Sequence, residues 1–314
     1  MRLARRRTNP TLSADTDEAG ATVRSRELGK AAAAPILALR EEDGWDFPGA
    51  YGFRTEPGQY MTTPPWNGFV LQPGFRLARP FALTDPAELR PPAPPPLASR
   101  AYARAFREVK ESGAVNSARR SDEQTSYALW WMEFAEGSVN RLARQLVAER
   151  GTHLWVAARL FAHLNMSLFD SYIANWDSKY EYNHWRPYTA IRAAGADNND
   201  ETTADPDWEP LRPTPPFPEY ASAHATACAA TMTVLESTFG KDVPFTMATT
   251  TAPPDMPTRS FSSFRDAARE CADSRVQLGW HFRYAAEAGL TLGRNVAKRT
   301  LRRQLKTENR SPWK

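Results

Sequence analysis

The sequence predicts an all-α fold, a helical bundle preceded by an irregular segment, on three observations. From Ser99 onward, apolar residues recur at the three- and four-residue intervals of amphipathic helices. No stretch alternates polar and apolar residues over a length that defines a strand. Between Glu41 and Arg100, prolines, glycines and aromatic residues are dense and no helical period survives. With 314 residues and 41% hydrophobic content, the chain is long enough to bury a sizeable core.

Three regions are expected along the chain. Residues 1–40 mix basic residues with Ser, Thr, Asp and Glu, as in a disordered or mobile basic tail. Residues 41–100 carry many aromatic side chains that need a surface to cover, so this segment is expected to wrap the helical body. Residues 101–314 are expected to form the helical body of the protein. The aromatic residues of the wrap are Trp45, Phe47, Tyr51, Phe53, Tyr60, Trp66 and Phe69.

The helical pattern is clearest after Leu154, where apolar residues recur every four positions up to Trp176 and share one helix face. Lys179 then lies about one turn beyond Trp176, at a helix end. The alanines that follow Ser222 predict a narrow helix suited to close contacts, which Gly240 ends. The predicted helices are Ala101–Ser112, Glu123–Ala135, Ser138–Glu149, Leu154 to about Trp176, Pro187 to about Ala194, Ser222–Phe239, Ser262 to about Leu278 and Phe282 to about Leu305.

Composition excludes several classes of protein. The 24% charged fraction and net charge of +4 are those of an ordinary globular protein, and no nucleic-acid partner is predicted. No run of eighteen apolar residues is present, so no transmembrane helix is expected. Cys228 and Cys271 are predicted to be packed free thiols in a reducing compartment, and without a convincing signal peptide the predicted location is cytoplasmic. A homodimer is left open.

Three short clusters carry the chemistry. Lys179 precedes Arg186 by seven residues, Ser222 stands two before His224, and Arg275 stands six before His281. Lysine and arginine gathered in a low-dielectric cleft repel one another unless an anion lies between them. Arginine offers a planar fork matched to oxyanions, and the N–H groups of a helix start add further donors. The clusters therefore predict a pocket for a phosphate-like tetrahedral oxyanion.

These clusters resemble the K-x6-RP, PSGH and SR-x5-H pattern of the vanadium-dependent haloperoxidase and type 2 phosphatidic acid phosphatase (PAP2) superfamily. The matching stretches are Lys179 to Pro187, Ala221 to His224 and Ser274 to His281. The resemblance implies that family's helical bundle, with vanadate as the cofactor of a peroxidase and no cofactor in a phosphatase. It also implies hydrogen peroxide, a halide and a small organic acceptor, or else a phosphate ester, as partners.

The resemblance also assigns roles. His281 binds vanadium, while the side chains of Lys179, Arg186 and Arg275, the hydroxyl of Ser222 and the N–H of Ala223 hold the oxygens. His224 is the acid–base group, and Lys179 polarises peroxide so that halide attacks it to give hypohalous acid. In a phosphatase, His281 attacks phosphorus instead and His224 protonates the leaving alcohol. Trp176 and Phe217 resemble the aromatic wall of the halide pocket in fungal-type chloroperoxidases.

Two departures from the family pattern stand out. Ala221 and Ala223 replace the Pro and Gly of PSGH, and a positive φ at Ala223 would cost about 1 kcal/mol. Many relatives carry an aspartate soon after the last histidine, whereas Glu287 is the first acid here, so the group that orients His281 is unassigned. Three hypotheses follow: a vanadium-dependent haloperoxidase, a PAP2 acid phosphatase using the same residues, and an inactive oxyanion-binding scaffold.

Overall fold

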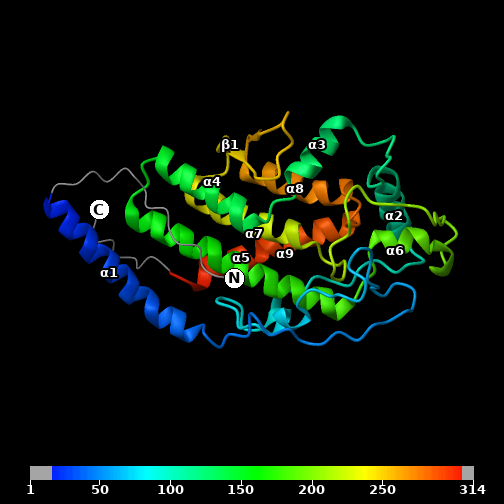
Figure 1. Cartoon of the computed structure of the whole chain (residues 1–314), viewed down its shortest axis with the longest axis horizontal. Coiled ribbons are helices and arrows are strands. Elements are labelled where there is room, and N and C mark those ends of the chain that lie inside the picture. Colours follow the sequence, from blue (N-terminus) through cyan, green and yellow to red (C-terminus); the bar gives the residue numbers. More distant parts are fainter. Residues whose placement is uncertain (1–15, 306–314) are drawn as a thin grey trace. The chain divides into compact units, whose positions relative to one another are not determined.

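The computed structural model describes residues 16–305 and is drawn in Figure 1. The chain divides after Asp43 into two compact units. The first unit holds α1 (Thr16–Leu39). The second unit holds the remaining helices, two short strands and three 3-10 turns, namely η1 (Pro73–Leu77), η2 (Pro86–Leu89), α2 (Arg100–Ser112), α3 (Asp122–Trp130), α4 (Ala135–Glu149), α5 (Leu154–Tyr182), α6 (Pro187–Arg192), η3 (Ala194–Ala196), α7 (Ala223–Phe239), β1 (Phe245–Ala248), β2 (Thr258–Phe261), α8 (Phe264–Gln277) and α9 (Arg283–Arg303). The predicted all-α class is confirmed.

Helix α1 differs from the tail that the sequence predicts. Its alanine run at 31–34 has the highest intrinsic helix propensity, and Lys30 pairs with Glu27 at 2.7 Å within one turn. Intrinsic helix propensity accounts for α1. Because the helix has no apolar periodicity, the sequence pattern did not predict it. The remainder of the predicted tail, residues 1–15, lies outside the described residues.

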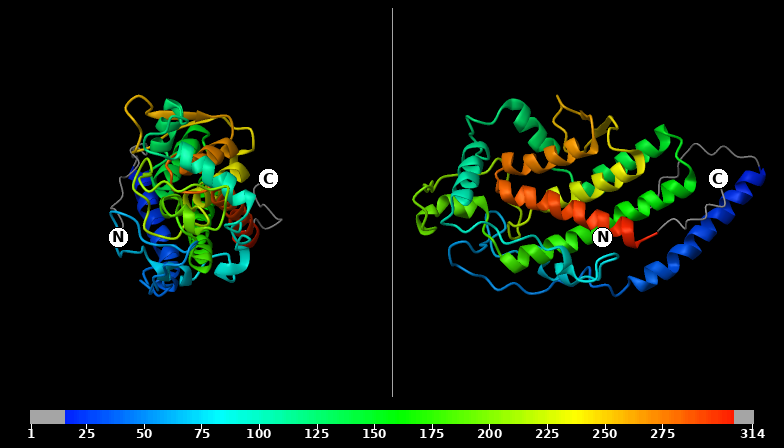
Figure 2. Two further views of the ribbon diagram at one scale, coloured as in Figure 1. Left: turned by 90° about the vertical axis from the view of Figure 1, so that its right-hand side faces the viewer. Right: turned by 180° about the vertical axis from the view of Figure 1, so that it is seen from behind.

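Helix α7 is the centre of the second unit. It packs most extensively against α9, then against α5 and α8, and also contacts α4. Figures 1 and 2 show these helices running alongside one another around α7. Most α7 residues are buried, so the helix is apolar or small on nearly every side. Helix α7 is thereby enclosed by four other helices.

The narrowness of α7 lets α9 approach closely. A Cβ added at Gly289 would lie 2.6 Å from the Ser222 carbonyl oxygen, and one at Gly293 would lie 2.1 Å from that of Thr226. Both distances are shorter than any real Cβ contact, so only glycine fits at these two positions of α9. The close contact that the alanine-rich sequence predicts is therefore confirmed, and it fixes the N-terminus of α7 against α9.

Helix α5 is longer than predicted. It continues six residues past Trp176 to Tyr182 and ends at Asn183, which adopts the left-handed conformation with φ of 46°. Lys179 lies in the last turn of α5, so its predicted place at a helix end is confirmed. Of the predicted apolar face, Leu160, Leu164 and Leu168 belong to the main hydrophobic core.

The segment from Gly44 to Ser99 contains no α-helix or strand, as predicted, and touches α5 at several points. Tyr60 is fully buried and its N–H donates to the Asn183 carbonyl at 2.7 Å. The amides of residues 81–83 donate to the carboxylate of Asp170. The expectation that its aromatic residues are covered is wrong for five of them. Trp45, Phe47, Phe53, Trp66 and Phe69 are between 40% and 59% exposed.

A short antiparallel hairpin corrects the prediction that the chain has no strands. β1 and β2 pair in register from Phe245 opposite Phe261 to Ala248 opposite Thr258. Phe245, Met247 and Phe261 are buried in the core, whereas Thr246 and Ser260 are exposed. Each strand has four residues, too few for a periodic signal in the sequence. Within residues 16–305, no helix combines the length and apolar character that a membrane span requires.

Candidate anion-binding active site

Three buried cations converge on the N-terminus of α7. Lys179 lies in the last turn of α5, Arg186 is the residue that caps α6 ahead of Pro187, and Arg275 lies in the last turn of α8. All three side chains have 0% exposure. The positive charges of Lys179, Arg186 and Arg275 all act on His281, so the structure brings together residues that are far apart in the chain.

Lys179 is held by the proline-rich loop that leads into α7. Its Nζ donates to the carbonyls of Pro218 at 2.9 Å, Glu219 at 3.0 Å and Ala221 at 2.7 Å. Burial, and then the charge of Arg186, hold the pKa of Lys179 well below its usual value. All three ammonium hydrogens are used by the loop. Lys179 therefore holds the loop in place and supplies positive charge. For Nζ to bind an anion directly, one of these three hydrogen bonds to a carbonyl must break.

Each arginine keeps one unpaired nitrogen. Arg186 donates through Nε to the Phe217 carbonyl and through Nη1 to the Trp280 carbonyl, at 2.9 and 2.8 Å, but its buried Nη2 has no partner. Arg275 donates through Nη2 to the Trp131 carbonyl at 2.7 Å, and its buried Nη1 has no partner. Burial lowers the pKa of Arg186 to about 10 and that of Arg275 to about 9. Both guanidinium groups thus retain a donor for a ligand.

The N-terminus of α7 supplies further unpaired groups. Ser222 caps the helix, and both its Oγ and the Nε2 of His224 are buried without a partner. Ala223 is the first helical residue, so its N–H has no acceptor within the helix. Because its conformation is helical, the penalty considered for a methyl at positive φ does not apply. Burial and then Arg275 lower the pKa of His224 to about 3, so its imidazole is neutral at neutral pH.

His281 has a partner that sequence reasoning missed. Its Nδ1 lies 2.9 Å from Oε1 of Glu219, a fully buried carboxylate on the loop before α7. Its Nε2 lies 3.1 Å from Nη1 of Arg186. The acid that contacts His281 does not follow it in the chain but precedes Ser222 by three residues. A lone acidic residue in the apolar Pro215 to Tyr220 stretch was the available signal.

The charges of the site do not balance. Lys179, Arg186 and Arg275 face the single carboxylate of Glu219, while His224 and His281 have pKa values lowered by burial. Burial raises the pKa of Glu219, although Arg186 and Lys179 oppose that rise. Like charges inside a protein are costly unless a counter-ion offsets them. The excess of positive charge fits a multivalent anion.

An aromatic pair borders the cations. Phe217 lies under Lys179 and Arg186, with 4.9 Å from the ring centroid to Nζ and 4.8 Å to Cζ. Trp176 contacts Phe217 with 5.1 Å between ring centroids. The two residues proposed for a halide pocket are therefore adjacent, and Phe217 joins them to the cationic centre. Of the other histidines, His163 contacts the Gln304 carbonyl away from the site, whereas His184 borders the site, with its ring against the Tyr284 hydroxyl and the Phe282 ring.

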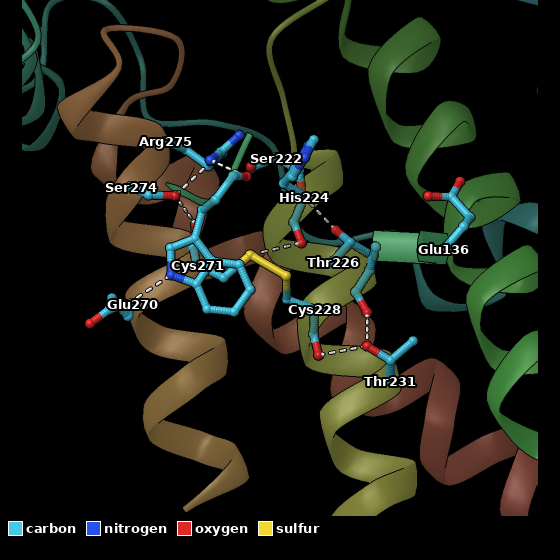
Figure 3. Close-up of a disulfide and its surroundings, with 12 residues drawn as sticks. Glu136, Ser222, His224, Thr226, Cys228, Thr231, Glu270, Cys271, Ser274 and Arg275 are labelled. Atoms are coloured by element: carbon cyan, nitrogen blue, oxygen red, sulfur yellow. Dashed lines mark hydrogen bonds between the residues drawn. A yellow bond between two sulfur atoms is a disulfide. The ribbon is translucent and has the colours of Figure 1, made fainter. Parts of the chain in front are cut away.

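A disulfide links the two helices that carry His224 and Arg275. Cys228 of α7 is bonded to Cys271 of α8, each one turn from the site residue on its helix (Figure 3). The Cys271 sulfur also lies 3.7 Å from the His224 carbonyl oxygen. The prediction of two packed free thiols is wrong, because α7 and α8 pack so closely that the two side chains meet. The argument for a reducing compartment loses its basis, and the cytoplasmic location stays a prediction.

Removing this disulfide is expected to lower the free energy of unfolding by about 2–4 kcal/mol. The bond closes a 43-residue separation, and that loop regains its conformational freedom in the unfolded chain when the bond is absent. Denaturant unfolding of the oxidised protein and of the Cys228→Ala/Cys271→Ala variant measures the difference. Reductant should shift the midpoint of the native protein and leave that of the variant unchanged. Equal midpoints for the oxidised protein and the variant would contradict the expectation.

Comparisons with known proteins agree with this geometry. The family model of the VCPO second helical-bundle domain matches residues 159–309, which include every proposed site residue. Vanadium chloroperoxidase from Curvularia inaequalis is 30% identical over 139 residues, which are 36% of this chain and 22% of that protein. The chain therefore matches less than a quarter of the length of this curated relative.

Solved structures extend the likeness over most of the chain. The first bacterial vanadium-dependent iodoperoxidase superposes with a TM-score of 0.74 at 26% identity, covering 86% of this chain and 66% of that one. A holo-type bacterial vanadium-dependent chloroperoxidase gives a TM-score of 0.69 at 19% identity, covering 87% and 71%, and shows the same fold. Together with the family model and the convergence of the three motifs, these matches identify the chain's relatives. Residues 159–309 are similar to the second helical-bundle domain of vanadium chloroperoxidases, and the chain has the helical fold of vanadium-dependent haloperoxidases.

Proposed function

We propose that the chain is a vanadate-dependent haloperoxidase that oxidises a halide with hydrogen peroxide to hypohalous acid. The observation that carries the proposal is a set of unpaired buried polar atoms around His281. They are Nη2 of Arg186, Nη1 of Arg275, Oγ of Ser222 and Nε2 of His224, together with Oε2 of Glu219. Buried polar groups in proteins are rarely left without a partner, so several in one place indicate a ligand. Their donors and the excess positive charge fit an oxyanion.

Vanadate fits the residues present. The two guanidinium groups, the Ser222 hydroxyl and the Ala223 N–H would hold its oxygens, and Nε2 of His281 would be its ligand to vanadium. Bound there, vanadate supplies a Lewis acid that activates peroxide toward a halide. Lys179 adds positive charge through the loop that it fastens. His224, neutral at neutral pH in the ligand-free protein, is the base that accepts a proton beside the anion.

Two observations favour a peroxidase over a phosphatase. Trp176 and Phe217 form an aromatic surface next to the cations, which suits a large, weakly hydrated halide. The similar solved structures are of vanadium-dependent iodoperoxidase and chloroperoxidase. An acid phosphatase remains the second candidate, because phosphate has nearly the shape and charge of vanadate and Nε2 of His281 can attack phosphorus. A homodimer stays a prediction.

Halide oxidation is expected to depend on orthovanadate. Peroxide-dependent bromination of a diketone, measured with and without added orthovanadate, tests the peroxidase, and hydrolysis of a phosphate monoester is followed in parallel. The expected result is bromination that appears with orthovanadate and is lost after its removal. Ester hydrolysis without bromination would replace this proposal by the phosphatase. Anion binding with neither reaction would favour the inactive scaffold.

A further inference from the structure

Glu219 is held in place from several sides. Its Oε1 accepts hydrogen bonds from Nδ1 of His281 at 2.9 Å and from the N–H of Phe282 at 3.0 Å. Its own N–H donates to the His184 carbonyl at 2.9 Å, and its carbonyl accepts from Nζ of Lys179. The side chain has 0% exposure. The carboxylate therefore cannot leave the imidazole unless the whole loop moves.

Two contacts of His281 define the same tautomer independently. Arginine nitrogens only donate, so the 3.1 Å contact with Nη1 of Arg186 requires a lone pair on Nε2 of His281. A neutral imidazole with that lone pair carries its hydrogen on Nδ1. Oε1 of Glu219 already accepts the N–H of Phe282, so it is an acceptor oxygen, and it lies where this hydrogen points. The ring is thus fixed in both orientation and tautomer.

We propose that Glu219 is a positioning residue that holds His281 as its Nδ1–H tautomer, with Nε2 directed at the bound oxyanion. The inference deepens the proposed function and rests on it for its anion-binding part. Partners of this kind orient an imidazole ligand and raise its basicity, and removing them commonly weakens binding tenfold to a hundredfold. No other carboxylate among the described residues contacts either nitrogen of this ring.

The opposing explanation is that Glu219 merely balances the charge of the three cations. The two explanations predict opposite effects on anion affinity. If Glu219 only balanced charge, Glu219→Ala would remove a negative charge beside the anion and tighten binding. If Glu219 positions His281, the same change weakens binding despite that electrostatic gain. Glu219→Gln separates the two roles, because its amide oxygen still accepts from Nδ1 while the charge is gone.

The tautomer is measured on the ligand-free protein by long-range 15N–1H NMR of the imidazoles. The chain has five histidines, so the His281→Ala variant suffices to assign the His281 signals. The Nδ1–H pattern is expected for the native protein and for Glu219→Gln, and its loss or mixture is expected for Glu219→Ala. An unchanged pattern in Glu219→Ala would overturn the proposal.

Affinity for orthovanadate, and for phosphate as a second probe, is measured by equilibrium dialysis. Glu219→Ala is expected to bind orthovanadate about tenfold to a hundredfold more weakly, and Glu219→Gln to remain within a few-fold of the native protein. Tighter binding by Glu219→Ala would also overturn the proposal. If the native protein bound neither anion, the proposed function would fail, while the NMR measurement would still decide the role of Glu219.

Asp170 provides a matched control for general destabilisation. Its carboxylate is also 0% exposed and accepts backbone hydrogen bonds, from Phe81, Ala82 and Leu83, but it lies two turns before Lys179 on α5. Asp170→Asn is expected to lower the thermal midpoint and to leave both the His281 tautomer and orthovanadate affinity as in the native protein. A change of tautomer in this variant would show that lost stability alone produces the effect.

Discussion

Arg275→Met is expected to weaken orthovanadate binding by about thirty-fold to several thousand-fold. Truncating one partner of a buried hydrogen-bonded charge pair costs about 2–5 kcal/mol of binding free energy, and each 1.4 kcal/mol is tenfold in affinity. Arg275 is fully buried, and its Nη1 has no protein partner, so this nitrogen is free to bind an anion. Equilibrium dialysis with orthovanadate measures the loss directly.

Thermal stability provides a second measure of the same change. A ligand that binds only the folded state stabilises it by about 2.7 kcal/mol at a hundred times its dissociation constant. Orthovanadate should therefore raise the thermal midpoint of the native protein, and this rise should vanish in Arg275→Met at the same concentration. Arg275→Lys keeps the charge and loses the planar fork, so an intermediate affinity is expected.

Arg265 is the matched control, because it lies on the same helix α8 but outside the site. Its side chain is 60% exposed and pairs with Glu236 on the surface. Arg265→Met should leave orthovanadate affinity unchanged, since an exposed pair contributes little and lies far from the buried cations. If Arg275→Met bound orthovanadate as the native protein does, the anion would not lie between the three cations.

The sequence predicts much of this site because its motifs combine residue type with spacing. Lys179 and Arg186 are separated by the end of α5 and the start of α6, and Ser222 with His224 begins α7. Spacing within each motif follows from one helix end and its flanking turn, so it is visible in a linear sequence. The mutual approach of the motifs depends on how α5, α7 and α8 pack, and only the resemblance to a family predicts it.

Contacts made across the fold were beyond prediction for the same reason. Glu219 and His281 are 62 residues apart, and no periodicity connects a loop carboxylate to a histidine before another helix. Cys228 and Cys271 are 43 apart, and only the packing of α7 against α8 makes them neighbours. The end of α5 was missed because Asn183, not a glycine or proline, provides the left-handed residue. Local sequence patterns predict single helices. Contacts between side chains on different helices or loops depend on how the whole core packs.

His224→Ala is expected to reduce turnover by about a hundredfold to ten-thousandfold while leaving orthovanadate affinity within a few-fold of native. General acid–base catalysis contributes rate factors of this size. The imidazole is neutral at neutral pH in the ligand-free protein, because burial and Arg275 lower its pKa to about 3, and the negative charge of a bound anion opposes that lowering. Its Nε2 is buried with no protein partner and is therefore available to the reacting groups. Binding is carried by Arg186, Arg275 and His281, which the change leaves in place.

The measurement is the rate of whichever reaction the native protein catalyses, bromination or ester hydrolysis, together with orthovanadate binding to the same variant. His163→Ala is the matched control, since His163 is also buried but its ring nitrogen pairs with the Gln304 carbonyl at the end of α9. It should retain native turnover. A loss of turnover and of binding in equal measure would make His224 a ligand of the anion rather than its acid–base group. Unchanged turnover would remove it from the reaction, because a proton-transfer group cannot be deleted without lowering the rate that depends on it.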